Sequence, residues 1–423
     1  MPNQLRALEA AVREHDLGLS DALASLSACF GQASSTNYSE VVYGTRPGWS
    51  LTVKYGKRGQ FAGLDTKRDL DDEARAEVLT MLRGRRTHRV ATTVLFSYLP
   101  VAGSWRYRDW FQISAVPDTF PQAEYSMAGG YPLPHPFFIE VAYSGSENKQ
   151  LDDYRSAVAT REATRLLSGV VRHIDDRLGS YPHADWFIPI DSGDSTTHPS
   201  PRLGWLGYAL DDYHRVAAEF TPITAETRAI PHDPHYGYYA KRGFTVGQLL
   251  TLPETVEDAL STYRDLPALD QDRFLHWCHW LNHAQQISNL SASASTIAAA
   301  QAIEALTPES PAGAKCVACG REDRLSIRAR VKKLLEEYAP GDEYAAARQE
   351  LYDYRSKFTH GSSLFYGELR HSAFGEFGPR SWIERDLSHA ALLAARTAGV
   401  NYLLGLGREP SDLSNGLPKS ARE

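Results

Sequence analysis

The chain has few cysteines, few lysines and no long apolar segment, and these shortages exclude several classes of protein. Four cysteines in 423 residues are too few for a disulfide framework. No apolar run reaches the roughly 18 residues that a membrane-spanning helix needs. The first residues, MPNQLRALEAAVREHDLG, include acidic side chains and lack the continuous apolar core of a signal peptide. We therefore expect a cytoplasmic protein that does not enter a membrane.

The charge balance excludes a broadly basic surface of the kind that coats nucleic acid. The formal net charge is −7, although a small nucleic-acid site needs only local positive potential. The chain has 35 arginines and 10 lysines, a bias that suits phosphate contacts but equally reflects genomic composition. A hydrophobic content of 42% with 23% charged residues is typical of a globular protein. The length predicts two domains, or three.

The two parts of the chain differ in their hydrophobic patterns. Residues 1–250 mix strand-like runs with a few helices, which predicts an α+β domain. The pattern does not give its function, and a sensor or regulatory role is a hypothesis only. We expect strands at 37–57 around a turn at 46–48, and at 90–99, 107–115, 136–143, 184–190 and 203–210, with helices at 3–30, 70–83 and 148–178.

The part from residue 251 to 405 is almost entirely helical in pattern, which predicts a helical bundle. Residues 406–423, rich in Pro, Ser, Asn and Gly, predict a flexible tail. The expected helices span about 254–263, 268–289, 291–306, 321–338, 343–358 and 381–405.

An arginine and a histidine lie close together in LYDYRSKFTHG, residues 351–361. Four to six residues separate such a pair at five places in the chain, about as many as chance gives, so spacing alone carries no weight. Only Arg355 and His360 combine a preceding helical pattern with a helix stop, which is Gly361 as the C′ residue. The other pairs are Arg83/His88, Arg177/His183, Arg228/His235 and Arg273/His279.

Helix geometry places a condition on this pair. In a continuous helix the side chains of Arg355 and His360 would point about 140° apart. They can converge only if the chain leaves the helix near Thr359, or if a second subunit completes the site.

The segment resembles the HEPN superfamily, and within it the Apea-like branch. Arg355, Ser356, His360 and Gly361 fill the places of that branch's signature, and residues 295–306, with Glu304, resemble its second helix. The resemblance covers about residues 255–405. It implies a bundle that dimerises so that two Arg/His sets face one cleft, an endoribonuclease that needs no cofactor, and a role as a toxin or antiphage effector.

RNA cleavage without a metal needs a base for the 2′-hydroxyl proton, positive charge for the phosphorane and an acid for the leaving 5′-oxygen. His360 can serve as base or acid, and Arg355 can brace the phosphate. Ser356 can hydrogen-bond the phosphate or His360. Glu304 either anchors Arg355 across the bundle or is an ordinary solvated residue.

Other readings of these residues remain open. Arg355 can pair with Glu350 or Asp353 at the surface while His360 merely caps a helix, which leaves an inactive HEPN-like module for dimerisation or for binding a nucleotide or RNA. Alternatively, the N-terminal part binds a peptide or nucleotide on an aromatic surface, although such a stripe is more often core. That stripe comprises Trp105, Tyr107, Trp110 and Phe111.

A cysteine pair, Cys316 and Cys319 followed by Gly320, resembles half of a structural zinc site. The loop either holds zinc with two further ligands or is reduced and metal-free. Cys278 lies on the apolar stripe with Phe274, Trp277 and Leu281, where a free cysteine is normally core. The further ligand candidates are Cys278 and the histidines of one helix face, His276, His279 and His283.

The densest basic run of the chain lies between the cysteine pair and the Arg355 helix. Four of its cations share one face if the segment is helical, and could steer an RNA backbone toward the cleft. The acidic residues among them dilute this field, and such runs are usually solvated faces. The four RNA-binding candidates are Arg321, Arg324, Arg328 and Lys332.

Overall fold

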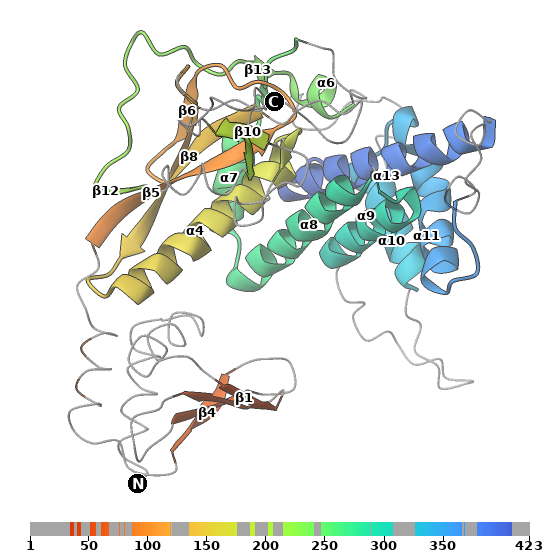
Figure 1. Ribbon diagram of the computed structural model, residues 1–423. Coiled ribbons are helices and arrows are strands. Elements are labelled where there is room, and N and C mark those ends of the chain that lie inside the picture. Colours follow the sequence, from red (N-terminus) through yellow and green to blue (C-terminus); the bar gives the residue numbers. More distant parts are fainter. Residues whose placement is uncertain are drawn as a thin grey trace.

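The protein has a mixed α+β architecture, with strands concentrated in the first half of the chain and helices in the second (Figure 1). The computed structural model describes residues 34–37, 40–43, 51–55, 61–66, 76, 80, 87–118, 120, 135–175, 187–190, 202–205, 215–240, 247–288, 290–307, 326–365, 368 and 379–407. The helix predicted at 3–30, the turn at 46–48 and the tail from residue 408 lie outside these ranges. Of the helix predicted at 70–83, only Ala76 and Thr80 are described, and both are helical.

A central antiparallel sheet organises the described first half. Its longest pair is β5 (Thr87–Ser97) and β8 (His135–Gly145), which run in register from Thr87↔Gly145 to Ser97↔His135. The strand order is β12-β5-β8-β7-β6, and β9 also pairs with β5. The remaining strands of this sheet are β6 (Ser104–Tyr107), β7 (Phe111–Ala115), β9 (Ile174–Asp175) and β12 (Arg215–Ala217).

One predicted strand, 107–115, is in fact the centre of a hairpin. β6 and β7 pair antiparallel, and a turn of three residues joins Tyr107 to Phe111. Arg108 takes a φ of 49° at this turn, a left-handed conformation that the strand-like pattern of side chains does not reveal. The aromatic stripe is mainly core, since Trp105, Tyr107 and Phe111 are buried.

Smaller sheets account for the other strands. β1 to β4 form a four-stranded antiparallel sheet, in which β2 and β3 lie within the predicted 37–57 strands and β4 was not predicted. β10 and β11 fall at the predicted 184–190 and 203–210, and β13 and β14 pair in parallel. The bounds are β1 Ser34–Asn37, β2 Glu40–Tyr43, β3 Leu51–Tyr55, β4 Phe61–Thr66, β10 Phe187–Ile190, β11 Arg202–Trp205, β13 His232–Asp233 and β14 Leu252–Pro253.

The long helix α4 (Lys149–Val170) joins the sheet to the bundle. Asn148 caps its N-terminus by accepting a hydrogen bond from the Leu151 amide. The helix ends at Val170 rather than at the predicted residue 178, because the chain turns at His173, with a φ of 71°, and returns as β9 to pair with β5. α4 packs against both β8 and α8.

The bundle consists of helices near their predicted positions (Figure 1). Helix α10 begins later than predicted, after Ser326, whose hydroxyl accepts the Ala329 amide. The short helix α6 was not predicted, because its six residues are too few to show a period. The bounds are α6 His235–Ala240, α7 Val256–Asp265, α8 Ala268–Ile287, α9 Ala292–Leu306, α10 Ile327–Tyr338, the 3₁₀ turn η2 Asp342–Tyr344, α11 Ala345–Thr359 and α13 Pro379–Leu403.

One hydrophobic core runs through the sheet, α4 and the bundle. Trp277 on α8 is a fully buried member of this core, and its indole N–H donates to the Ala395 carbonyl at 3.1 Å. Gly399 on α13 is required there, since a Cβ atom would lie 2.0 Å from the indole. The predicted division at residue 250 therefore separates two sequence patterns within a shared core. None of the described helices is long and apolar enough to cross a membrane.

Candidate functional site

Helix α11 carries the Arg/His segment and ends where the sequence predicts. Its apolar positions Ala347, Leu351 and Phe358 are buried against the bundle. Gly361 has a φ of 67°. Its amide donates to the Phe358 carbonyl at 3.0 Å, and the Ser362 amide donates to the Lys357 carbonyl at 3.0 Å. These two bonds form a Schellman motif, so the prediction of Gly361 as the C′ residue is confirmed.

Arg355 faces the neighbouring helix α9. Its Nη2 donates to Glu304 Oε2 at 3.1 Å, and its Nε lies 3.0 Å from Glu304 Oε1. The second contact is an ion-pair distance without hydrogen-bond alignment, so we count one hydrogen bond. Exposure is 20% for the Arg355 side chain and 16% for Glu304. Of the two alternatives for Glu304, the structure agrees with the first: Glu304 on α9 anchors Arg355 on α11 and is not an ordinary solvated residue.

His360 and Ser356 occupy a different side of α11. His360 is exposed, and its amide still donates to the Ser356 carbonyl at 3.1 Å. The helical register therefore continues up to His360. Viewed along the helix axis, the side chains of Arg355 and His360 point about 140° apart. His360 and Ser356 are one turn apart and share a side. The helix exit comes too late to bring Arg355 and His360 together within one chain.

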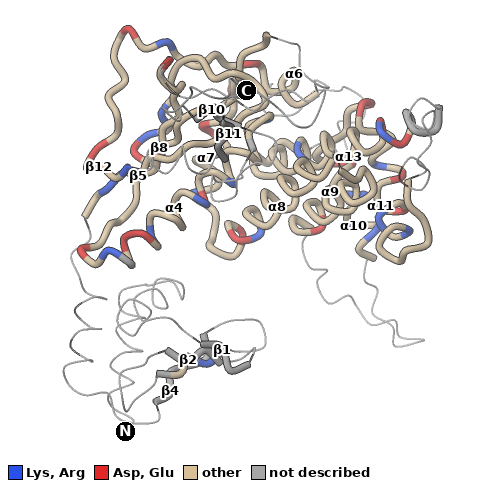
Figure 2. Tube along the Cα trace, in the orientation of Figure 1, with Lys and Arg blue, Asp and Glu red and all other residues tan. Residues whose placement is uncertain are grey.

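The two described basic candidates are both engaged with acids. Arg328 Nη2 lies 2.9 Å from the Asp353 carboxylate, and Lys332 Nζ lies 3.7 Å from Glu336 Oε1. Asp353 is one turn before Ser356, so Arg328 stands near the His360 side of α11. Figure 2 shows basic and acidic positions interspersed along the helices, which weakens the local positive potential. Arg321 and Arg324 lie outside the described residues.

The zinc prediction concerns residues that the structure does not describe, namely Cys316 and Cys319. Cys278 is fully buried in the core, as its place on the apolar stripe predicts. His276, His279 and His283 are exposed on the opposite side of α8. In the described part of the chain, no group of three or more His, Cys, Asp or Glu residues could hold a metal ion.

Arg396 on α13 is a buried charge that the sequence analysis missed. Its Nη1 donates to the Ser168, Gly169 and Val171 carbonyls at 2.7, 3.1 and 3.1 Å, and its Nη2 donates to Gln285 Oε1 at 2.6 Å. These carbonyls belong to the C-terminal end of α4, where a cation is favoured. Burial lowers the pKa of Arg396 to about 10. In the sequence, Arg396 could have been found as the single charged residue of the apolar run ALLAARTAGV, residues 391–400.

A second polar group stands beside Arg396 where α4 ends. Arg172 Nη1 donates to the Tyr238 carbonyl at 2.6 Å, and the Tyr239 hydroxyl donates to the Val170 carbonyl at 2.7 Å. Burial, then the charges of Arg172 and Arg396, lower the pKa of His173 to about 3. These residues fix the junction between the sheet and the bundle.

No protein-family model, curated protein or solved structure matches the chain.

Proposed function

We propose that the chain is a metal-independent endoribonuclease of the HEPN type, with a bundle over residues 251–405 that acts as a homodimer. The observation that supports it most is the Arg355–Glu304 ion pair. It joins the two segments that resemble the family, α9 and α11, through the residues that the resemblance singled out. Ser356 and His360 lie at the end of the same helix but on another side of it, where His360 is exposed.

The chemistry assigns a role to each residue. His360 makes one of the two proton transfers, either taking the proton of the 2′-hydroxyl or giving one to the leaving 5′-oxygen, and water makes the other. The 2′-oxygen attacks phosphorus, the bond to the 5′-oxygen breaks, and a 2′,3′-cyclic phosphate results. Arg355 stabilises the charge on the phosphorane through a planar, permanently charged group. Ser356, one turn before His360, donates to the phosphate or orients the imidazole.

A second copy of the chain allows an arginine and a histidine to reach the same phosphate, which one chain alone does not. Arg355 and His360 point about 140° apart on one helix, so a phosphate held by Arg355 of one copy is reached by His360 of another. A two-fold axis across α11 forms two such sites. This arrangement makes dimerisation part of catalysis.

The experiment compares purified full-length wild type with His360→Ala and Arg355→Ala on RNA in the presence of a chelator. We expect cyclic phosphate ends from the wild type and at least a roughly 100-fold loss in each variant. His283→Ala, an exposed histidine on α8, is the matched control and retains activity. Equal cleavage by all four proteins contradicts the assignment. In cells, we expect expression of wild type but not of His360→Ala to arrest growth, as a toxin or antiphage effector would.

A second candidate function is an inactive HEPN-like module that dimerises or binds a nucleotide or RNA. The observation in its favour is that Arg355 is already engaged, with Glu304 on one side and its Cζ 5.6 Å from the Tyr352 ring centroid. This candidate predicts no cyclic phosphate ends at any protein concentration, together with RNA binding that His360→Ala leaves unchanged.

A further inference from the structure

Two side chains hold the guanidinium of Arg355, and Glu304 is only one of them. The Arg355 Cζ atom lies over the ring of Tyr352, 5.6 Å from its centroid, which is within the range of a cation–π contact. Tyr352 precedes Arg355 by three residues on α11, a spacing that places the two side chains on neighbouring turns of one helix face. The guanidinium therefore has a carboxylate at one edge and an aromatic ring against one face.

These contacts leave part of the guanidinium available to a ligand. Arginine carries five N–H donors in one plane. Nε and Nη2 form the edge that faces Glu304, whereas Nη1 has no hydrogen bond among the described residues. The outer edge, formed by Nη1 and the second hydrogen of Nη2, is a fork that can bind two phosphate oxygens at once. Nε is buried although the side chain is 20% exposed, so the exposed surface of Arg355 lies away from Nε.

Tyr352 is in turn held by the protein core. It is half-buried and packs against the main hydrophobic cluster. An arginine side chain by itself has many rotamers, and each must be restricted before the guanidinium can act at a fixed point. The ring restricts the plane of the guanidinium, and Glu304 restricts its direction within that plane.

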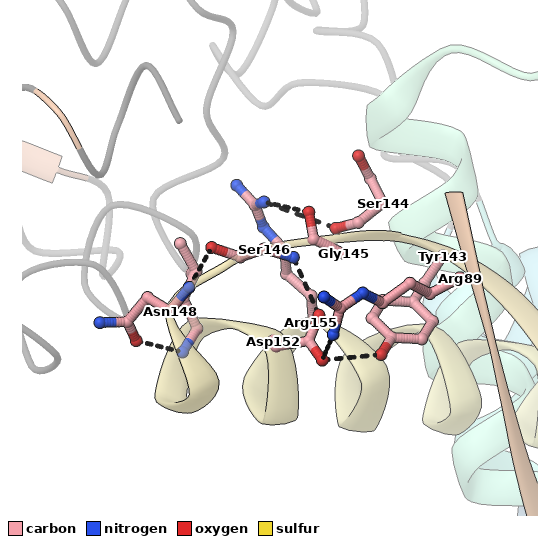
Figure 3. A network of polar contacts seen from close by, with 9 residues as sticks. Arg89, Tyr143, Ser144, Gly145, Ser146, Asn148, Asp152 and Arg155 are labelled. Atoms are coloured by element: carbon pink, nitrogen blue, oxygen red, sulfur yellow. Dashed lines mark hydrogen bonds and ion pairs between the residues drawn. The ribbon is translucent and has the colours of Figure 1, made fainter. Parts of the chain in front are cut away.

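Arg89 shows how the same fold builds an arginine–carboxylate pair in which the carboxylate is fully used. The Asp152 carboxylate on α4 accepts three hydrogen bonds. Its donors are Arg89 Nη1 at 2.7 Å, the Tyr143 hydroxyl at 3.0 Å and the Ser146 amide at 2.8 Å (Figure 3). Glu304 accepts one aligned bond from Arg355, and its Oε1 has no hydrogen bond within the described part of the chain. The weaker anchor at Glu304 increases the importance of the ring for holding Arg355.

We propose that Tyr352 is a positioning residue for the ribonuclease reaction, because its ring keeps the outer edge of the Arg355 guanidinium directed at the phosphorane. This inference rests on the proposed function. Tyr352 acts through Arg355 and does not touch the reacting atoms. The phosphorane carries more negative charge than the phosphodiester, so a displaced guanidinium weakens transition-state binding more than substrate binding. The loss therefore falls on kcat rather than on KM.

The test measures initial rates of RNA cleavage by the full-length protein over a range of RNA concentrations. Tyr352→Leu keeps an apolar side chain but removes the ring, and we expect kcat to fall at least about fivefold while KM changes less than about twofold. Tyr352→Phe keeps the ring and stays within about twofold of the wild type. Tyr402→Leu is the matched control, since Tyr402 on α13 is also partly exposed and packs on the Tyr338 ring at 5.4 Å, and it retains full kcat.

A second measurement tests the contact without using cleavage. Urea unfolding compares the wild type, Tyr352→Leu, Arg355→Gln and the double variant. If the ring holds the guanidinium, the two losses of stability are not additive. Additive losses overturn the proposal even where kcat falls. Equal loss of kcat in Tyr352→Phe and Tyr352→Leu also overturns it, because the ring is then not the cause, and so does an equal loss in Tyr402→Leu.

The outcomes separate this proposal from the proposed function. A wild type that gives no cyclic phosphate ends contradicts the ribonuclease and with it the reaction that Tyr352 serves. A wild type that cleaves RNA, together with an unchanged kcat in Tyr352→Leu, contradicts only the positioning role.

Discussion

Arg355 of α11 and Glu304 of α9 form a half-buried ion pair, with Nε 3.0 Å from Oε1 and Nη2 3.1 Å from Oε2. The pair fixes which side of α11 faces the bundle. As a consequence, His360 is exposed on another side, where Ser356 is partly buried. The same contact thus keeps Arg355 on a different side of α11 from His360 within one chain.

The first prediction concerns the stability of this pair. Glu304→Gln and Arg355→Gln each leave a half-buried partner uncompensated, so each lowers the free energy of unfolding by about 1–3 kcal/mol. The double variant loses less than the sum. Urea unfolding of the wild type, the two single variants and the double variant measures the coupling energy of the pair. The more exposed Arg273–Asp270 pair serves as a control, with a coupling energy below about 1 kcal/mol. Additive losses at Arg355 and Glu304 contradict the coupling.

The second prediction tests whether the site spans two copies. Each of Arg355→Ala and His360→Ala is inactive alone. Mixed in equal amounts and allowed to exchange, they give heterodimers with one intact site of two, so activity returns to about a quarter of wild type. A site within one chain gives no recovery, because no chain then carries both residues. The readout is the yield of cyclic phosphate ends.

The third prediction isolates backbone strain at the end of α11. A Cβ atom at Gly361 meets nothing within 4 Å, so Gly361→Ala costs only the left-handed φ, about 1 kcal/mol of unfolding free energy. Gly361→Asn costs less, since asparagine tolerates this region. Thermal unfolding of the two variants gives the comparison. Equal stability of Gly361→Ala and wild type contradicts the assigned conformation.

The fourth prediction is a pH dependence of stability from His173. Its folded pKa is lowered to about 3 from 6.5, by burial first, so the unfolded chain binds the proton more readily between these values. The contribution is fully present above pH 6.5 and is lost as the pH falls toward 3. Between pH 7 and pH 5, the free energy of unfolding of the wild type therefore falls by up to about 2 kcal/mol more than that of His173→Asn. Asparagine is the chosen replacement because it tolerates the positive φ of this position. Parallel curves contradict this.

The fifth prediction tests the shared core. Arg396→Met removes the donors to the end of α4 and to Gln285, and lowers the unfolding free energy by about 3 kcal/mol. Arg385→Met, an exposed arginine on the same helix, has little effect. Because the sheet and the bundle share one core, both proteins unfold in a single transition. Two separate transitions contradict a common core.

The sequence predicted the bundle helices and the end of α11 well, because apolar periodicity and a C′ glycine act within a few residues. It did not reveal the β6–β7 hairpin, since the turn depends on the backbone of Arg108 rather than on a glycine. It placed a boundary near residue 250 because the pattern changes there, whereas burial continues across it through Leu250 and Leu252.

For the candidate site, the sequence by itself determined the residues: an arginine, a serine and a histidine at the end of one helix, with a glycine that stops it. The tertiary structure alone decided their relationship. Arg355 is 51 residues from Glu304, and only the packing of α9 against α11 brings them together. Local propensity sets where a helix runs and ends, but the packing of distant elements sets which of its faces is buried. That choice leaves His360 exposed on the side away from Arg355.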